Sequence, residues 1–311
     1  ILPLRGNMPQ LTANGLDIEY DTFGRESDPA ILLIMGFAAQ MTMWPTSLCE
    51  GLARRGFRVI RFDNRDVGKS THLMDKGIPN VGGALAMLAM NQQASGAPYL
   101  LDDMAADTVG VLDALDMKSA HIVGASMGGM IAQIVAARHP NRARSLVSIM
   151  STTGRHGLPH GEPEAMAVLT LPPASDSRDD RIAAGFRIWR TIGSPGFRPT
   201  DEELRSVIER EVDRVPYEPT GAARQLMAIL CSPPRNDILE TVRCPALVIH
   251  GADDPLIPVE CGRDTASSIP GAELIVVPGM AHDFTDALLP VYLTYIGEFV
   301  SGVEANAKAA E

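Results

Sequence analysis

Short apolar runs alternate with amphipathic segments along most of the chain. The runs are rich in β-branched residues, which is typical of strands that are buried on both faces of a sheet. The segments between them repeat with the period of a helix. Strands that alternate with helices in this way predict an α/β fold, with a mostly parallel sheet and helices on both faces. The predicted strands span residues 10–13, 16–23, 30–35, 58–63, 120–124, 145–151, 246–250 and 273–277, and the predicted helices span residues 45–55, 102–116, 127–138, 262–268 and 285–300.

This alternation stops between residues 153 and 240. Proline-separated helical patterns occupy residues 178–192, 200–214 and 219–231, and no strand pattern is visible there. We therefore expect residues 153–240 to be a helical cap inserted between strands of a core formed by residues 1–152 and 241–311. Residues 74–100 form a second irregular segment, rich in Gly, Ala and Met. We interpret it either as a flap at the mouth of a pocket or as a loop with one short helix.

Composition narrows the classes of function. The chain has 311 residues, of which 45% are hydrophobic and 21% charged, so a disordered or fibrous protein is not expected. The net charge of −11 disfavours nucleic acid as a partner, because the phosphates would be repelled. Every long uncharged stretch is broken by polar residues or glycines, which disfavours a membrane span. Residues 1–7 show no secretory signal, and the four cysteines have no metal-binding spacing, so we expect a cytoplasmic protein without a metal site.

The clearest chemical motif is Gly124-Ala-Ser126-Met-Gly128, which directly follows an apolar strand and directly precedes a helix. A serine at the top of such a sharp turn has a strained backbone and an exposed hydroxyl group. Bulky side chains two residues before and after it would collide, and Gly124 and Gly128 remove that collision. Ser126 is therefore the candidate nucleophile.

A serine hydroxyl needs a base, and the base needs a carboxylate that orients it. Downstream, the strand 246–250 leads into a loop with Asp253 and Asp254, and the strand 273–277 leads to His282. The carboxyl ends of parallel strands share one edge of a sheet, so these side chains are expected near Ser126. The spacing Gly251-x-x-Asp254 favours Asp254 over Asp253 as the acid. Of the seven histidines, only His282 has the expected position for the base.

Two backbone N–H groups are candidates to stabilise an oxyanion. Met127 supplies one at the start of the helix after Ser126, and Phe37 supplies the other in the loop after the strand 30–35. The charged turn at residues 62–70 is interpreted as a structural brace, in which Asp63 and Arg65 bind backbone groups of the loops.

Together these motifs resemble the α/β-hydrolase superfamily over residues 9–300. Within it, Met35-Gly36 followed by Trp44-Pro45 resembles bacterial carboxylesterases of the aclacinomycin methylesterase-like type. The resemblance implies an eight-stranded sheet, a helical cap and no cofactor. Asp66 stands where the superfamily usually has glycine. The matching segments are residues 35–37, 63–70, 124–129, 251–258 and 279–282.

We therefore expect a serine carboxylic ester hydrolase that acts on small to medium, largely apolar esters through an acyl-enzyme. A carbon–carbon bond or enol-lactone hydrolase, or an acyltransferase, would use the same Ser-His-Asp triad and remains an alternative. A non-catalytic binder on this fold would not need the full triad. The expected partner is a small-molecule ester, and the expected assembly is a monomer or homodimer.

Overall fold

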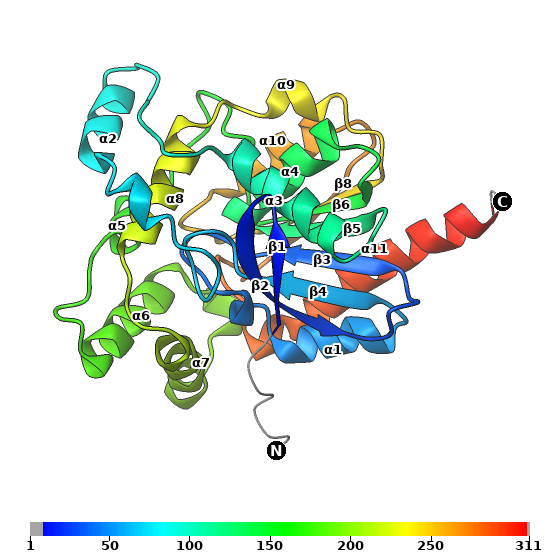
Figure 1. The fold of residues 1–311 in the computed structure, drawn as a ribbon, viewed down its shortest axis with the longest axis horizontal. Coiled ribbons are helices and arrows are strands. Elements are labelled where there is room, and N and C mark those ends of the chain that lie inside the picture. The colour runs from blue at the N-terminus through cyan, green and yellow to red at the C-terminus, as the bar shows by residue number, and fades with distance from the viewer. Residues whose placement is uncertain (1–8, 310–311) are drawn as a thin grey trace.

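The computed structural model describes residues 9–309 and contains one eight-stranded sheet in that part of the chain (Figure 1). The strand order is β1-β2-β4-β3-β5-β6-β7-β8. Strand β2 runs antiparallel to β1 and β4, and all other neighbours are parallel, which confirms the predicted mostly parallel sheet. The expectation that residues 1–7 carry no secretory signal concerns a segment outside the described residues. The strands are β1 (Gln10–Ala13), β2 (Leu16–Phe23), β3 (Ala30–Ile34), β4 (Arg58–Phe62), β5 (Ala120–Ala125), β6 (Ala143–Ile149), β7 (Ala246–Gly251) and β8 (Glu273–Val277).

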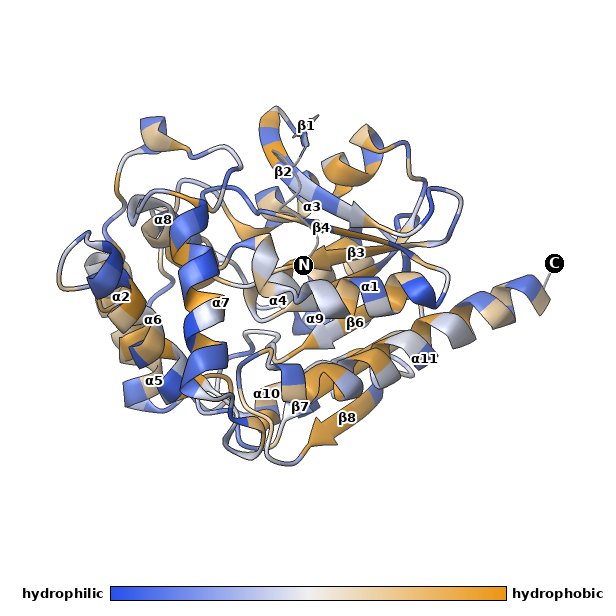
Figure 2. Cartoon of the chain, turned by 90° about the horizontal axis from the view of Figure 1, so that it is seen from below, coloured by the Kyte–Doolittle hydropathy of each residue, from blue (hydrophilic) through white to orange (hydrophobic). Residues whose placement is uncertain are grey.

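Two hydrophobic clusters cover the two faces of the sheet, as predicted. One face packs against α3 (Leu101–Ala114) and α4 (Met127–Arg138), and the other packs against α1 (Thr46–Arg54) and α11 (Leu289–Ala309). Every residue of β3 and β5 is buried, as expected for strands that are covered on both sides. In Figure 2, β8 is coloured as hydrophobic, whereas α7 (Asp201–Arg214), which lies away from the sheet, is coloured as mostly hydrophilic.

The segment between β6 and β7 is helical, and its described residues contain no strand. Its helices are α5 (Pro163–Val168), α6 (Arg178–Ile192), α7, α8 (Thr220–Cys231) and α9 (Asn236–Leu239). Side-chain caps at Ser177 and Thr200 begin α6 and α7, and both helices begin within one residue of the predicted positions. Figure 1 shows α5 to α8 beyond the carboxyl ends of the strands.

A few boundaries differ from the prediction. Helix α10 runs over Val259–Ser268, directly after Pro258, and thus begins before the predicted start at residue 262. The face that it buries consists of small or polar residues such as Gly262 and Thr265, so no apolar pattern marks its first turn. Helix α11 continues to Ala309, beyond the predicted end at residue 300. Residues 74–100 contain a short helix, α2 (Val81–Ala89), beside α8. Across the described residues, no helix has both the length and the apolar character needed to cross a bilayer.

Candidate functional site

Ser126 lies in a strained turn between β5 and α4. Its backbone has φ 55° and ψ −121°, a conformation that non-glycine residues rarely adopt. A Cβ atom at Gly124 would lie 2.0 Å from the carbonyl oxygen of Gly128, and one at Gly128 would lie 2.0 Å from that of Ile34. Both glycines are therefore required for this turn, as the motif predicted. The Ser126 N–H donates to the Ile149 carbonyl at 2.9 Å, which helps to hold the turn in place.

Asp254 and His282 are hydrogen-bonded to each other. The distance from Nδ1 of His282 to Oδ2 of Asp254 is 2.8 Å, and both residues are buried. The other carboxylate oxygen, Oδ1, accepts from the N–H groups of Leu256 and Ile257, each at 2.9 Å. Because an ionised carboxylate only accepts, the hydrogen of the ring lies on Nδ1, and Nε2 is left free to accept a proton.

The neighbouring carboxylate and imidazole have other contacts. Asp253 is exposed, and its Oδ2 accepts from the Gly279 N–H at 2.7 Å, so it closes the loop before His282. His250 is fully buried, and its Nε2 lies 2.8 Å from the Ile257 carbonyl oxygen. Burial lowers the pKa of His250, and the charge of Asp254 only partly opposes that shift. Asp254 and His282 therefore form the hydrogen-bonded pair, whereas Asp253 and His250 bind backbone groups instead.

The loop after β3 lies directly against Ser126. A Cβ atom placed on Gly36 would be 3.1 Å from Cβ of Ser126, so a side chain here would crowd the serine. Within residues 9–309, neither the Phe37 N–H nor the Met127 N–H has a hydrogen-bond partner. The two predicted donors therefore flank the serine and remain available.

Gln225 of α8 holds this loop from the other side. Its Oε1 accepts from the Ala38 N–H at 2.8 Å, and its Nε2 donates to the Arg65 carbonyl oxygen at 2.7 Å. Ala38 has a positive φ of 53°, and the Gln225 side chain is completely buried. Sequence reasoning missed Gln225, because a glutamine on an amphipathic helix gives no signal of a contact 187 residues away.

The His282 loop is also bound to the inserted helices. The His282 N–H donates to the Ile192 carbonyl at 3.0 Å. The Ser194 hydroxyl donates to Oδ1 of Asp283 at 2.5 Å, and the Ser194 N–H donates to Oδ2 at 2.9 Å. The Ala281 N–H in turn donates to the Ser194 hydroxyl at 2.7 Å. Burial raises the pKa of Asp283, and its two hydrogen bonds from Ser194 oppose that shift.

The charged turn after β4 acts as the predicted brace. Asp63 accepts from the Met41 and Lys69 N–H groups at 2.7 and 2.9 Å. Arg65 binds Asp107 through two nitrogens, rather than binding only backbone groups. These contacts fix the loops on both sides of the turn.

Asp66 occupies the position where the superfamily usually has glycine, and it has the positive φ, 66°, that glycine would favour. Its carboxylate accepts from two nitrogens of Arg224 on α8, at 2.9 and 2.7 Å, and from the Tyr99 hydroxyl at 2.8 Å. Both ionic side chains are almost completely buried. The departure from glycine therefore creates a buried ion pair between the brace and the inserted helices.

Ser126 and His282 open into one cavity of about 250 Å³. No hydrogen bond joins the two side chains within the described residues. The cavity walls are mostly apolar and come from the loop after β3, from the loop after β8 and from the inserted helices. No residue of the segment 74–100 lines this cavity, and its short helix α2 fits the second interpretation of that segment, a loop with one short helix. The apolar side chains in the walls belong to Met35, Phe37, Ala38, Ala39, Met43, Ala125, Met150, Leu169, Ile188, Trp189, Ile192, Leu256 and Phe284.

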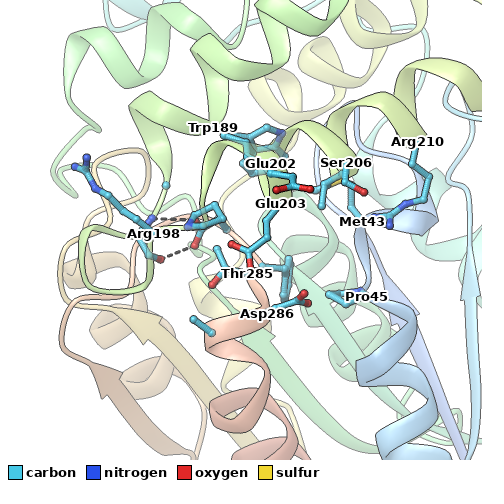
Figure 3. Close-up of a pocket in the computed structure, with 18 of the residues that line it drawn as sticks. Met43, Pro45, Trp189, Arg198, Glu202, Glu203, Ser206, Arg210, Thr285 and Asp286 are labelled. Carbon is cyan, nitrogen blue, oxygen red and sulfur yellow. Dashed lines mark hydrogen bonds between the residues drawn. The ribbon is translucent and has the colours of Figure 1, made fainter.

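A larger cavity of about 520 Å³ adjoins the first and shares Met43, Trp189, Asp283 and Phe284 with it (Figure 3). Figure 3 shows Glu202 and Glu203 of α7 facing Thr285 and Asp286 across this space. The outer cavity is therefore more polar than the inner one. In residues 9–309, no group of three or more His, Cys, Asp or Glu side chains is arranged to hold a metal ion.

Comparisons with known proteins agree with this architecture. A family model described as the α/β hydrolase fold matches residues 29–285. Rhodomycin D methylesterase DauP of Streptomyces sp. (strain C5) is 26% identical over 294 residues, which cover 88% of this chain and 91% of that protein. The enol-lactonase from Burkholderia xenovorans LB400 superposes with a TM-score of 0.67 at 21% identity, over 96% of this chain and 100% of that one. The meta-cleavage product hydrolase CumD from Pseudomonas fluorescens IP01 superposes with a TM-score of 0.68 at 17% identity, over 96% of this chain and 98% of that one.

The two solved structures share the fold with this protein, and the family model covers most of its length. The relatives named are esterases and other hydrolases, as the motifs around Ser126, Asp254 and His282 led us to expect. This chain belongs to the α/β-hydrolase fold family and is an esterase-like hydrolase.

Proposed function

We propose that this protein is a serine carboxylic ester hydrolase for small to medium, largely apolar esters. One observation carries the proposal: Ser126, held in a strained turn, shares a small cavity with His282, and the ring of His282 is oriented by Asp254. A nucleophile, a base and an orienting acid are the three groups that acyl transfer through serine requires.

The reaction would proceed in two halves. Oγ of Ser126 attacks the ester carbonyl carbon while its proton passes to Nε2 of His282. The N–H groups of Phe37 and Met127 bind the oxyanion, and the bond to the alcohol then breaks as His282 returns the proton to the leaving oxygen. Water repeats the sequence on the acyl-enzyme and releases the acid. Asp254 stabilises the imidazolium in both halves. In enzymes without bound substrate, the hydrogen bond between the nucleophile and the base is often long or absent, and it tightens in the Michaelis complex.

The inner cavity supports the assignment of substrate size. Its volume of about 250 Å³ lies below the usual range for drug-sized ligands, about 300–1,000 Å³, which favours a compact ester. Leu169, Ile188, Trp189 and Ile192 of the inserted segment supply much of its apolar wall. We therefore assign residues 153–240 as a cap over a core formed by residues 1–152 and 241–311. The similarity to a protein named a methylesterase also favours an ester with a small alcohol.

Hydrolysis of p-nitrophenyl acetate and butyrate by the wild type and by Ser126→Ala tests the proposal. Loss of the nucleophile should lower kcat by at least about 10³-fold. Ser47→Ala is the control, because Ser47 lines only the outer cavity, and it should keep wild-type turnover. An organophosphonate should label the wild type once, at Ser126. Unchanged turnover in Ser126→Ala, or labelling elsewhere, would overturn the proposal.

A further inference from the structure

The inner cavity is lined by an acidic residue that the proposed reaction does not use. Glu211, near the end of α7, lines the cavity together with Ser126 and His282. Among the described residues that line it, the only other acidic one is Asp283, and both carboxylate oxygens of Asp283 accept hydrogen bonds from Ser194. A carboxyl group in a largely apolar wall is costly unless something binds to it.

The position of Glu211 is fixed at both its backbone and its side chain. Its Oε1 accepts from the Thr42 hydroxyl at 2.5 Å, and its carbonyl oxygen accepts from Nε2 of Gln40 at 2.8 Å. Its Oε2 has no hydrogen-bond partner in residues 9–309, and it is not one of the fully enclosed polar atoms. The side chain keeps 15% of its surface exposed. One oxygen is thus held in place and remains accessible.

From these contacts we propose that Glu211 forms a subsite that binds a hydroxyl group on the substrate, through an O–H donated to Oε2. The inference rests on the proposed esterase function and names its substrate class: compact esters that carry a hydroxyl group on the acyl chain. A hydroxyl group is one of the few neutral groups that would satisfy this oxygen in an otherwise apolar cavity.

The charges around Glu211 favour a neutral donor over a cation. Nε of Arg210 lies 3.8 Å from Oε1, and Arg214 follows on the same helix. Arg214 is itself bound to Asp63, the acidic group that faces Glu211 from the end of β4. Two guanidinium groups already stand near this carboxyl group, so a substrate ammonium would meet repulsion as well as attraction.

The same surroundings set the pH at which this subsite acts. Burial raises the pKa of Glu211 to about 7, while the Thr42 hydrogen bond and the charges of Arg210 and Arg214 oppose the shift. A carboxylate accepts a hydrogen bond more strongly than the neutral acid does. Binding of the hydroxyl group should therefore strengthen as the pH rises through about 7.

The test compares matched substrates within each protein. Methyl butanoate, methyl 2-hydroxybutanoate and methyl 3-hydroxybutanoate are hydrolysed by the wild type, Glu211→Gln, Glu211→Leu and the control Glu209→Gln. The readout is the ratio of kcat/KM for each hydroxy ester to kcat/KM for methyl butanoate, which cancels general effects of a substitution. The ratio for at least one hydroxy ester should fall by roughly 10- to 100-fold in Glu211→Leu, the value of a hydrogen bond to a charged group. Glu209, which lies on α7 outside both cavities, should keep the wild-type ratio.

The pH dependence supplies a second readout. In the wild type the ratio should rise between pH 6 and 8, and in Glu211→Gln it should be flat. Wild-type ratios in both variants, or a pH dependence that survives in Glu211→Gln, would overturn the subsite. A larger Glu211-dependent preference for methyl 3-aminobutanoate would overturn the choice of a hydroxyl group. Failure of the proposed function itself looks different, because methyl butanoate would then be untouched or would be hydrolysed independently of Ser126.

Discussion

Replacing Asp254 by asparagine changes the proposed chemistry of His282 with almost no change in shape. Oδ1 of Asp254 accepts from two backbone N–H groups, so the asparagine must keep its carbonyl oxygen on that side. Its NH₂ group then faces Nδ1 of His282, the position that now lies 2.8 Å from Oδ2. To avoid two opposing hydrogens, the ring must carry its hydrogen on Nε2. In that tautomer Nε2 cannot take the proton of Ser126, so we expect kcat to fall by about 10⁴-fold.

The stability of this variant should change much less than its activity. The asparagine keeps the bonds to Leu256 and Ile257 and loses one charge-assisted bond, so the free energy of unfolding should fall by about 1–3 kcal/mol. Asp253→Asn is the matched control, one residue away in the same loop. Because Asp253 is exposed and, within the described part of the chain, its side chain accepts a hydrogen bond only from the Gly279 N–H, its replacement should leave kcat within about threefold.

Steady-state hydrolysis of p-nitrophenyl butyrate at pH 8 and urea unfolding measure these two quantities for both variants. The reasoning is refuted if Asp254→Asn keeps more than about a tenth of the wild-type kcat while it is folded. It is refuted equally if Asp253→Asn loses as much activity as Asp254→Asn.

Two further predictions concern residues outside the triad. Gln225→Leu removes the partners of the Ala38 N–H and the Arg65 carbonyl, so the loop that carries the proposed Phe37 donor should loosen. We expect kcat to fall tenfold or more with little change in KM, and a rise in KM alone would contradict this role. Burial lowers the pKa of His121 to about 4, below its unfolded value of 6.5, so the unfolded state binds more protons between these pH values. The free energy of unfolding should therefore fall by up to about 3 kcal/mol as the pH drops from 6.5 to 4. Urea unfolding of His121→Gln should lack this loss, and an equal loss in the variant would disprove the role of His121.

Local patterns in the sequence were enough to predict the strands and the strained turn. The collision that Gly124 and Gly128 avoid depends on atoms within the turn and the adjoining strand, so the motif itself carries the information. The same holds for Asp254 and His282, since the ends of parallel strands meet at one edge of the sheet. Helix α10 was only partly predicted, because the face that it buries is not apolar.

The contacts made by the inserted helices could not be predicted in this way. Glu211 and Gln225 lie on amphipathic helices whose pattern gives their period but not their partners. Gln225 reaches Ala38 across 187 residues, and Glu211 reaches Thr42 across 169. Such contacts depend on how whole helices pack against the core, and no short motif marks them. The residues that shape the cavity were accordingly harder to predict than the residues expected to perform the reaction.

The ion pair between Asp66 and Arg224 has a consequence for chimeric enzymes. One way to alter the selectivity of such an enzyme is to replace its inserted helices with those of another hydrolase. A transplanted segment without an arginine at the place of Arg224 would leave the Asp66 carboxylate in the interior with only Tyr99 and a backbone N–H as partners. An uncompensated charge of this kind costs about 3–5 kcal/mol, a large share of the stability of a typical domain. In this protein, the turn at residues 63–70 and helix α8 therefore have to be exchanged together.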